Sequence, residues 1–529
     1  MRLPPGVAKP ARLAHFKVYQ PCNAVLNASP LPMTRAWWAA LAALPVIVLC
    51  LRALGFLPSV IDWDESLYIL QAREWLRGGW PLVAVWDMHP IGGPAMFAMA
   101  MLVFGESIGA LRMLGVIAVS ATGWALFFLL RAGGLPLAVG YAAALLYAGH
   151  SVLLGGMPVN TEILFAPFVA TAMLVALPAA LNPERPPETW RVVTMGLLVG
   201  WAMMIKPVVM PEGCLAFAVL VGGALLRRSM GVPRLLRFAA IYAALCVAPT
   251  FLFGLVYLLM GEFALYLDST ILAPFTYAQA GIALSRGAWR LASVAIYLLW
   301  LFLLAAGALL LLKRQPLVAI ALAWFGAATL AITLPAQFFP HYFLVWLPSL
   351  SVLAALGAHA LSRFLAPRRA MLCLALVTTA VSLDPWRNDS APRIWSGHRL
   401  FELDAPARIA AHIAEEMPPG ETIFVANYQP IVYFLADAAL PTRFAFPAHL
   451  TGVWSNLAGF DTDAEIARIL ETRPRFIVVD RTSWDAMRPA AARAIAGALE
   501  AAYQIAYVFA DGRFTVELWR VRDPDPETD

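Results

Sequence analysis

The stretch RMLGVIAVSATGWALFFLL, residues Arg112–Leu130, decides the fold class because its single charged side chain, Arg112, stands at its start. A helix rises about 1.5 Å per residue, so a run of this length covers the roughly 30 Å of hydrocarbon in a bilayer. Similar apolar runs recur through residues 1–384, and the whole chain is 61% hydrophobic and 13% charged. Soluble proteins carry about 25% charged residues. The composition therefore excludes an ordinary soluble enzyme and predicts a polytopic α-helical membrane protein.

The net charge of +5 is divided unevenly along the chain. Residues 1–384 contain 24 Lys and Arg against 13 Asp and Glu, whereas residues 385–529 contain 14 against 20. In membrane proteins Lys and Arg collect in cytoplasmic loops and contact anionic lipid head groups. The basic surplus therefore predicts membrane lipids as partners and requires no nucleic acid. The acidic second part has no long apolar run and is expected to be a soluble domain.

Eleven membrane spans are expected from the apolar runs. Besides 112–130, they cover residues 37–57, 135–154, 163–181, 192–209, 212–226, 238–260, 290–312, 316–335, 342–362 and 370–384. Residues 1–36 contain basic residues and no acid, which predicts a cytoplasmic tail before a signal-anchor helix. The membrane domain is thus expected over residues 37–384.

The apolar run at residues 91–104 is not counted as a span. It is short for a span, and Gly92, Gly93 and Pro94 interrupt its start. Leaving it out also places the later basic loops on the cytoplasmic side, as the positive-inside rule prefers. A juxtamembrane or re-entrant helix is expected there instead. The loops at 58–111, 155–162, 261–289 and 336–341 and the tail at 385–529 are then extracytoplasmic, which in a bacterium means periplasmic.

The tail at 385–529 alternates helix-like and β-rich segments. Helices are expected near 405–417, 430–437, 462–473 and 487–502, and strands near 422–425 and 476–479. This alternation is typical of an α/β domain. Glycine-rich phosphate-binding loops are absent from the sequence, so a soluble nucleotide-binding fold is not indicated.

An acidic group, Asp62, Asp64 and Glu65, follows the first expected span directly. Asp62 and Glu65 have the spacing of a capping box that opens a helix at about 63–77, and this structural interpretation stays open for both. It does not account for Asp64, which would lie in the first turn, where the helix dipole favours a charged carboxylate. A carboxylate held at the membrane surface can accept a proton from a hydroxyl. Asp64 is therefore a candidate general base.

A second carboxylate, Glu162, opens the expected span at 163–181 on the same side of the membrane as Asp64. A glutamate at a helix N-terminus often serves only as a partner of the helix dipole. However, two intervening spans return the chain to one face, so Asp64 and Glu162 can converge on one cavity. Such a pair suits acid–base work or a divalent cation with oxygen ligands.

Further candidates are Lys206, His89, His341 and Tyr342. Lys206 stands near the outer end of an apolar run, where a lysine either extends to the interface or binds a lipid-borne phosphate. His89 could assist with the phosphate, although a lone interfacial histidine is more often a hydrogen-bonding residue. His341 and Tyr342 lie between two expected spans, where aromatic residues mostly form an interfacial belt but could also line a site.

The order of these features resembles the type C glycosyltransferases, specifically the group of families 39 and 83. This group contains the protein O-mannosyltransferases and the aminoarabinose transferase that modifies lipid A. The resemblance is clearest over about 60–210 and rests on Trp63-Asp64-Glu65, Tyr68, Gly78-Gly79-Trp80-Pro81, His89-Pro90, Phe104-Gly105, Leu111-Arg112 and the acid at Glu162. Pro340-His341-Tyr342 and the tail segment Pro474–Arg481 also look like bacterial members.

The resemblance implies inverting transfer of a sugar from a polyprenyl-phosphate donor to a lipid, glycan or protein acceptor at the outer membrane face. By similarity, Asp64, with Glu65 beside it, and Glu162 match catalytic acids. Lys206, with His89 or Arg112, matches a donor-phosphate site, and Tyr68, His341 and Tyr342 are expected to line it. This sequence departs from the aminoarabinose transferase at His89, where that enzyme has lysine before proline.

The location implied is the bacterial inner membrane with a periplasmic tail domain. The expected chemistry requires no cofactor, although Asp64 and Glu162 are compatible with a divalent metal. Two other functions stay open from the sequence. A transporter is one, because polytopic chains with intramembrane charges are often carriers. A non-catalytic envelope scaffold that uses the tail for recognition is the other.

Overall fold

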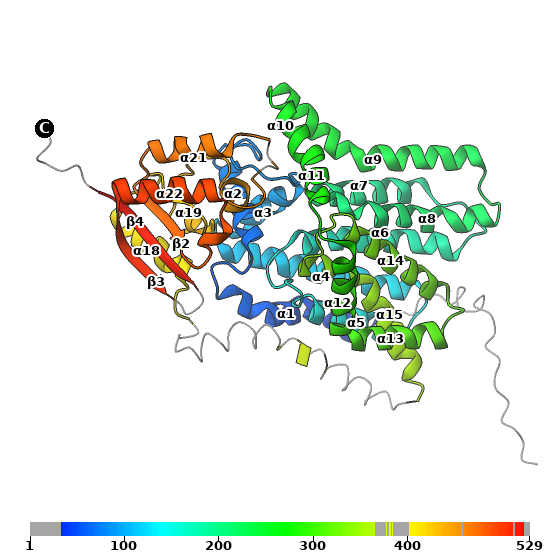
Figure 1. Ribbon diagram of the computed structural model, residues 1–529. Helices are drawn as coiled ribbons and strands as arrows, with labels where there is room; N and C mark the ends of the chain where they lie inside the picture. The colour runs from blue at the N-terminus through cyan, green and yellow to red at the C-terminus, as the bar shows by residue number, and fades with distance from the viewer. Residues whose placement is uncertain are drawn as a thin grey trace, which may run out of the picture.

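The computed structural model describes residues 33–364, 401–455, 457, 459–510 and 514–522, with residues 377, 380, 381 and 383. Almost all of the expected cytoplasmic tail at 1–36 and of the expected last span at 370–384 lies outside the described residues. The described chain forms a helix bundle with a small α/β domain at one end, drawn at the left in Figure 1. The helical membrane fold and the C-terminal α/β character predicted from the sequence are thus confirmed.

The bundle is built from helices of very different lengths. They are α1 (Arg35–Arg52), η2 (Ala53–Phe56), α2 (Trp63–Leu76), α3 (Gly92–Phe104), α4 (Ile108–Ala132), α5 (Leu137–His150), α6 (Thr161–Leu181), α7 (Thr189–Ile205), η3 (Pro207–Val209), α8 (Met210–Leu226), α9 (Val232–Leu259), α10 (Phe263–Leu267), η4 (Asp268–Leu272), α11 (Ala273–Gln279), α12 (Leu284–Tyr297), α13 (Leu299–Leu311), α14 (Pro316–Thr333), η5 (Pro340–Val345) and α15 (Trp346–Leu361). In the described chain, seven segments are long and apolar enough to cross a membrane. They are Arg35–Phe56, Ile108–Ala132, Thr161–Leu181, Pro207–Leu226, Val232–Leu259, Pro316–Thr333 and Pro340–Leu361.

Three of the expected spans take a different form from a single straight span. The segment at 290–312 is divided into α12 and α13, which meet at a bend of 83°. The division follows the side chains, because α12 carries Arg286 and Arg290 one turn apart, whereas α13 is wholly apolar. A helix with one charged face suits the membrane interface. The expected spans at 135–154 and 192–209 appear as the shorter apolar helices α5 and α7, and 91–104 appears as the short helix α3.

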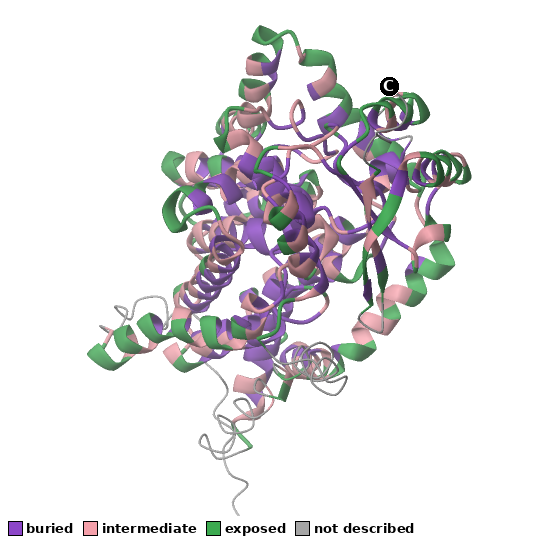
Figure 2. Ribbon diagram, turned by 90° about the vertical axis from the view of Figure 1, so that its left-hand side faces the viewer, coloured by how far each residue is buried: buried purple, intermediate pink, exposed green. Residues whose placement is uncertain are grey.

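Burial separates the inside of the bundle from its outer surface. Figure 2 shows buried residues concentrated in the middle of the bundle and exposed residues on its outer helices. Many of the exposed side chains are apolar, and α9 presents Phe251, Leu252 and Leu259 outward. Apolar side chains on the surface of a helix bundle are stable where lipid, not water, surrounds them. The exposed face of α9 is therefore suited to contact hydrocarbon.

The tail domain packs helices around a four-stranded sheet of order β1-β2-β4-β3. Its elements are α18 (Ala405–Glu416), β1 (Phe424–Val425), α19 (Ile431–Leu435), α20 (Pro447–Leu450), α21 (Thr462–Glu471), β2 (Phe476–Asp480), η7 (Trp484–Ala486), α22 (Pro489–Ala502), β3 (Tyr503–Ala510) and β4 (Thr515–Val521). Strands β1 and β2 are parallel, with Phe424 opposite Ile477, and β4 is antiparallel to both β2 and β3. The sequence patterns located α18, α19, α21, α22 and the two parallel strands but not α20, η7 or the hairpin β3–β4.

Polar contacts hold the tail domain on the loop and helix that follow α1. The buried guanidinium of Arg73 donates to the carbonyls of Tyr433 at 2.8 Å and Ala438 at 3.2 Å. Asp404 accepts from the Ser59 amide at 2.8 Å and from its hydroxyl at 2.7 Å. Hydrogen bonds to a charged partner contribute about 1.5–3 kcal/mol each. These contacts place the domain directly over α2.

Candidate active site

A cavity of about 530 Å³ lies where α2, the bundle and the tail domain meet. Its lining comes from α2, the loop after it, the end of α7, α11, η5 and the tail segment 446–454. The residues are Asp62, Trp63, Asp64, Leu67, Tyr68, Asp87, Met88, His89, Gly155, Lys206, Tyr277, Phe339, Pro340, His341, Tyr342, Phe446, Ala448, His449 and Trp454. Six of the nine site residues predicted from the sequence, namely Asp64, Tyr68, His89, Lys206, His341 and Tyr342, line this cavity.

The start of α2 presents Asp64 to the cavity. Asp62 is the N-cap, and its carboxylate accepts from the Asp64 amide at 3.1 Å. The capping interpretation of Asp62 is therefore correct. Burial raises the pKa of Asp64 to about 7, with further upward contributions from Asp62 and Asp87 and downward ones from His89 and Lys206. A carboxyl that titrates near neutrality can both take up and release a proton at physiological pH.

Glu65 and Arg112 do not belong to the cavity lining in the described structure. The Arg112 guanidinium donates to the Glu65 carboxylate, and both side chains are buried at 3% exposure. Glu65 also accepts from the amides of Ile61 at 3.2 Å and Val159 at 3.0 Å. The catalytic role of Glu65 and the phosphate contact of Arg112 therefore stay predictions, because neither side chain lines the cavity. Their carboxylate and guanidinium are used in joining α2, α4 and the loop before α6.

Glu162 and Lys206 form a second buried ion pair. The Lys206 ammonium donates to the Glu162 carboxylate at 2.6 Å, and the Tyr342 ring lies 4.2 Å from the same nitrogen. Lys206 has an extended backbone at the end of α7 because Pro207 follows it, and a residue before proline disfavours the helical conformation. Unlike Glu162, Lys206 lines the cavity. Glu162 therefore does not meet the cavity itself but positions the ammonium of Lys206 in it.

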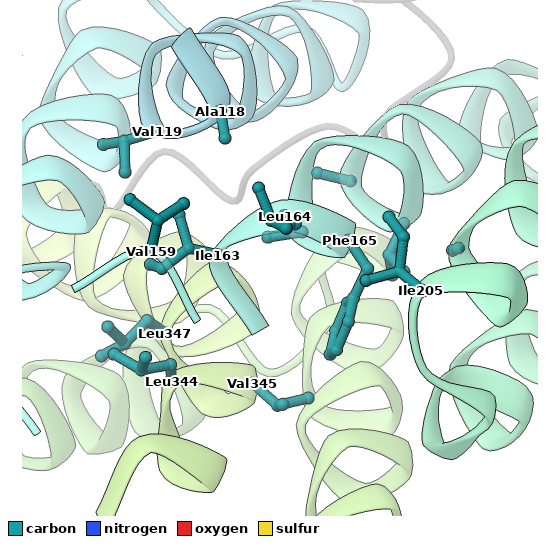
Figure 3. Close-up of a cluster of buried hydrophobic side chains, with 14 of the residues drawn as sticks. Ala118, Val119, Val159, Ile163, Leu164, Phe165, Ile205, Leu344, Val345 and Leu347 are labelled. Atoms are coloured by element: carbon teal, nitrogen blue, oxygen red, sulfur yellow. The ribbon is translucent and has the colours of Figure 1, made fainter. Parts of the chain in front are cut away.

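The end of α6 that carries Glu162 is fixed by apolar packing. Figure 3 shows Val159, Ile163, Leu164 and Phe165 from this segment among the side chains of η5 and α15 and Ile205 of α7. All of these residues are buried. Close packing of this kind leaves little freedom for rotation. The cluster holds Glu162, the end of α7 and η5 in a constant relation to one another.

His89 is oriented by Asp87, which the sequence reading did not assign to the site. The Nδ1 atom of His89 lies 3.2 Å and 3.1 Å from the two Asp87 oxygens, one of which also accepts from the Met88 amide at 2.7 Å. Burial acts to raise the pKa of Asp87, but His89, His449 and the Met88 amide together outweigh burial and leave the pKa below its ordinary value. Because Asp87 takes Nδ1, Nε2 is the ring nitrogen that can meet a phosphate oxygen.

Aromatic side chains complete the walls. Tyr68 stacks on Phe97 at 5.6 Å between ring centres and meets His89 edge-on at 6.3 Å. The hydroxyls of Tyr277 and Tyr342 are 3.3 Å apart, and His341 packs against the Tyr342 ring at 4.8 Å. Burial raises the pKa of Tyr68 well above its ordinary value, so the Tyr68 phenol stays neutral.

The sequence reading also missed Tyr277 and the tail residues Phe446, His449 and Trp454. Asp87 had a usable signal, since it stands two residues before His89. Tyr277 and the tail residues had none, because only folding brings α11 and the tail beside α2.

Asp64 and Glu162, the predicted metal ligands, do not belong to a larger group of possible ligands in the described chain. Among the residues described, no group of three or more His, Cys, Asp or Glu side chains could hold a metal ion. One Glu162 oxygen is already engaged by Lys206. Metal binding by Asp64 and Glu162 stays a prediction.

Comparison with known proteins identifies the fold. A family model described as dolichyl-phosphate-mannose-protein mannosyltransferase matches residues 88–253. The crystal structure of ArnT from Cupriavidus metallidurans bound to undecaprenyl phosphate has a TM-score of 0.61 and 15% identity, covering 92% of this chain and 98% of that chain. The apo structure of the same protein has a TM-score of 0.56 and 17% identity, covering 91% and 98%.

Among curated protein sequences, none matches the chain. The solved structures show the shared fold. The family model covers the segment from His89 to Lys206, which contributes much of the cavity lining. The resemblance to the type C glycosyltransferases that the sequence suggested is confirmed, together with the class of enzyme.

Proposed function

We propose that this chain, which has the fold of a type C glycosyltransferase, transfers a sugar with inversion from a polyprenyl-phosphate donor to a hydroxyl acceptor at the periplasmic face of a bacterial inner membrane. The observation that carries the proposal is the shared cavity of Lys206 and Asp64, in which a cation suited to phosphate lies near a carboxyl suited to proton transfer. The related ArnT fold with undecaprenyl phosphate bound supports a donor of this chemistry.

The donor phosphate would be held by Lys206 and His89. Lys206 acts as a point charge toward phosphate oxygens. Its partner Glu162 keeps the ammonium in place, and Asp87 turns the Nε2 edge of His89 to the ligand. As the bond to the anomeric carbon breaks, negative charge collects on the leaving phosphate. A cation already fixed at that position stabilises the transition state without reorganising.

Asp64 would serve as the general base. The acceptor oxygen forms a bond to the anomeric carbon from the face opposite the phosphate, its proton passes to Asp64, and the bond between the anomeric carbon and the phosphate oxygen breaks. Polyprenyl phosphate leaves with the electron pair of that bond. One displacement inverts the anomeric carbon. A base with a pKa near the working pH, as for Asp64, is the most effective.

The donor lipid explains why the site is built against a membrane domain. An apolar polyprenyl chain can lie along the exposed apolar faces of the bundle while its phosphate reaches the cavity at the bundle end. The reaction as written needs no metal or other cofactor, since Lys206 supplies the positive charge. A transfer rate that depended on added Mg²⁺ or Mn²⁺, or was lost with EDTA, would overturn this part of the proposal.

The test is Asp64→Asn, which keeps the size of the side chain and removes the base. The acceptor is identified first, by mass spectrometry of envelope glycolipids and glycoproteins from a strain lacking the chain and from its parent. The transfer rate is then measured with purified protein in proteoliposomes supplied with polyprenyl-phosphate-linked mannose, arabinose or aminoarabinose. Loss of a general base lowers transfer by about 10²–10⁴-fold, whereas Asp485→Asn, at an exposed position outside the cavity, leaves the rate unchanged.

The same variant separates the rival functions. A scaffold retains its envelope phenotype in the Asp64→Asn strain. A transporter moves polyprenyl-linked sugar across the bilayer without forming a glycosylated product. Either result contradicts the proposed transfer reaction.

A further inference from the structure

The tail segment 446–454 forms a wall of the cavity that none of the roles assigned so far uses. Phe446, Ala448, His449 and Trp454 line the cavity from this side. The segment is held firmly at the carboxyl end of β1, where the Thr451 hydroxyl donates to the Ala426 carbonyl at 2.7 Å. The carboxyl ends of parallel strands are the usual binding edge of α/β domains. The tail domain thus presents the carboxyl end of β1 to the cavity.

Aromatic rings from both domains meet along this wall. Trp454 packs against Tyr277 of α11 at 4.9 Å between ring centres, and Phe446 packs against Trp63 of α2 at 6.2 Å. The face of an aromatic ring carries partial negative charge. It therefore attracts the weakly positive C–H groups on the face of a sugar ring. Rigid aromatic side chains also lose little conformational entropy when a ligand binds.

His449 provides a polar group without a partner in the same wall. Its side chain is 3% exposed, and its Nδ1 atom has no hydrogen-bond partner among the described residues. Burial lowers the pKa of His449 to about 4, so the ring is neutral at physiological pH. A neutral imidazole has one donor and one acceptor nitrogen. Leaving a buried polar atom unpaired costs about 1–3 kcal/mol, which a ligand hydroxyl would recover.

The charges of the lining argue against a phosphorylated ligand on this side. Asp62, Asp64 and Asp87 all line the cavity, and the ammonium of Lys206 already has a carboxylate partner. No arginine is found among the described lining residues. A second phosphate would therefore meet like charge without a free cation. A ligand with hydroxyls and no net negative charge fits the wall better.

We propose that segment 446–454 is the acceptor subsite and that it takes an uncharged sugar ring, stacked on Trp454 and hydrogen-bonded to His449. This inference rests on the proposed function. In an inverting displacement the acceptor must approach opposite the leaving phosphate. Lys206 belongs to the bundle and segment 446–454 to the tail domain, and Asp64 lies on α2, next to the tail domain in Figure 1. The acceptor hydroxyl would thus arrive from the tail side, within reach of Asp64.

The experiment measures sugar binding and donor binding separately on the full chain in lipid nanodiscs loaded with undecaprenyl phosphate. Saturation-transfer NMR with methyl glycosides reports contact between sugar C–H groups and the protein. We expect signals from the uncharged glycosides that fall at least fivefold in Trp454→Ala and severalfold in His449→Phe. Affinity for undecaprenyl phosphate and for polyprenyl-phosphate-linked mannose stays within twofold of wild type in both variants.

Matched controls are Trp190→Ala, an exposed tryptophan outside the cavity, and His412→Phe, a tail histidine away from it. Both should leave the glycoside signals unchanged. Unaltered signals in Trp454→Ala and His449→Phe would overturn the subsite. So would preferential binding of glucose 6-phosphate or of a serine-containing peptide.

A loss of affinity for the mannose-linked lipid but not for undecaprenyl phosphate would assign the wall to the donor sugar and also overturn the proposal. Failure of undecaprenyl phosphate to bind the wild-type protein would instead count against the proposed function. Correct folding of each variant is checked by size-exclusion chromatography of the nanodiscs.

Discussion

The Glu65–Arg112 pair and the Glu162–Lys206 pair are both buried ion pairs between neighbouring segments, but they have different surroundings. Glu65 accepts from two backbone amides besides Arg112, and neither member of that pair lines the cavity. Lys206 opens into the cavity and is covered on one side by the Tyr342 ring. Burial and charge are therefore insufficient to mark a functional pair. What distinguishes the two is whether one charged atom remains accessible to a ligand.

The largest effect is expected from removing the accessible charge without leaving its partner unpaired. The double variant Lys206→Met with Glu162→Gln eliminates both charges, so no buried charge is left uncompensated. Transfer from the polyprenyl-phosphate donor should fall on the order of 10³-fold, because a preorganised charge at the leaving group is lost. Initial rates in proteoliposomes measure the loss, and thermal unfolding verifies the fold. A rate within tenfold of wild type would show that Lys206 does not hold the phosphate.

Changes in the Glu65–Arg112 pair, which does not line the cavity, should affect stability and not the transfer rate. Arg112→Met leaves the Glu65 carboxylate buried without its partner, which costs about 3–5 kcal/mol of stability. Thermal unfolding in detergent measures the loss, and Glu65→Gln combined with Arg112→Met should recover most of it. The transfer rate per folded molecule should stay near that of wild type. A stable Arg112→Met protein that fails to bind undecaprenyl phosphate would instead support the phosphate contact predicted for Arg112.

The pH dependence of transfer tests whether Asp64 is the general base in the cavity. Burial, and then Asp62 and Asp87, raise the pKa of Asp64 to about 7, while His89 and Lys206 oppose the rise. The base must be ionised, so kcat/KM should fall about tenfold per pH unit below pH 7 and level off above it. A profile that is flat from pH 5 to pH 8 would exclude Asp64 as the base.

The smallest effect is expected from Asp62→Asn, which should shift the acidic limb of the pH profile, the range in which kcat/KM falls with falling pH. Asparagine also caps helix N-termini, so α2 should persist. Removing a like charge beside Asp64 lowers its pKa, and the acidic limb should move to lower pH. Asp463→Asn, in the tail outside the cavity, is the matched control and should leave the profile in place. A limb that stays in place in Asp62→Asn would mean that another group controls it.

Much of the fold was predictable because it follows from local chemistry. Apolar runs predicted the long helices, and alternating segments predicted the α/β tail, including α18, α21 and β2. The hairpin β3–β4 was missed because Tyr503 begins β3 directly after the helix α22 without a glycine or proline to mark the boundary. The break between α12 and α13 was missed because a hydropathy window averages over a charged face.

The candidate site was predictable only at residues whose charge is energetically costly to place at a membrane boundary. Asp64, Glu162 and Lys206 stood out because ionisable groups at a membrane boundary need partners. Glu65 follows Asp64 in the chain, but it pairs with Arg112 and does not line the cavity. Successive helical residues differ by about 100° in direction, so the position of Asp64 in the cavity does not by itself place Glu65 there.

The sequence by itself determined the membrane class, the two-part organisation and the chemistry of the most informative acids and the lysine, because hydrophobicity and charge act locally. Only the tertiary structure decided which charges are neutralised inside the protein and which face the cavity. It alone also brought His449 and Trp454 into the cavity that Asp64 lines, although they lie more than 380 residues away in the chain. Contacts between such distant residues depend on how the two domains pack, which no local pattern encodes.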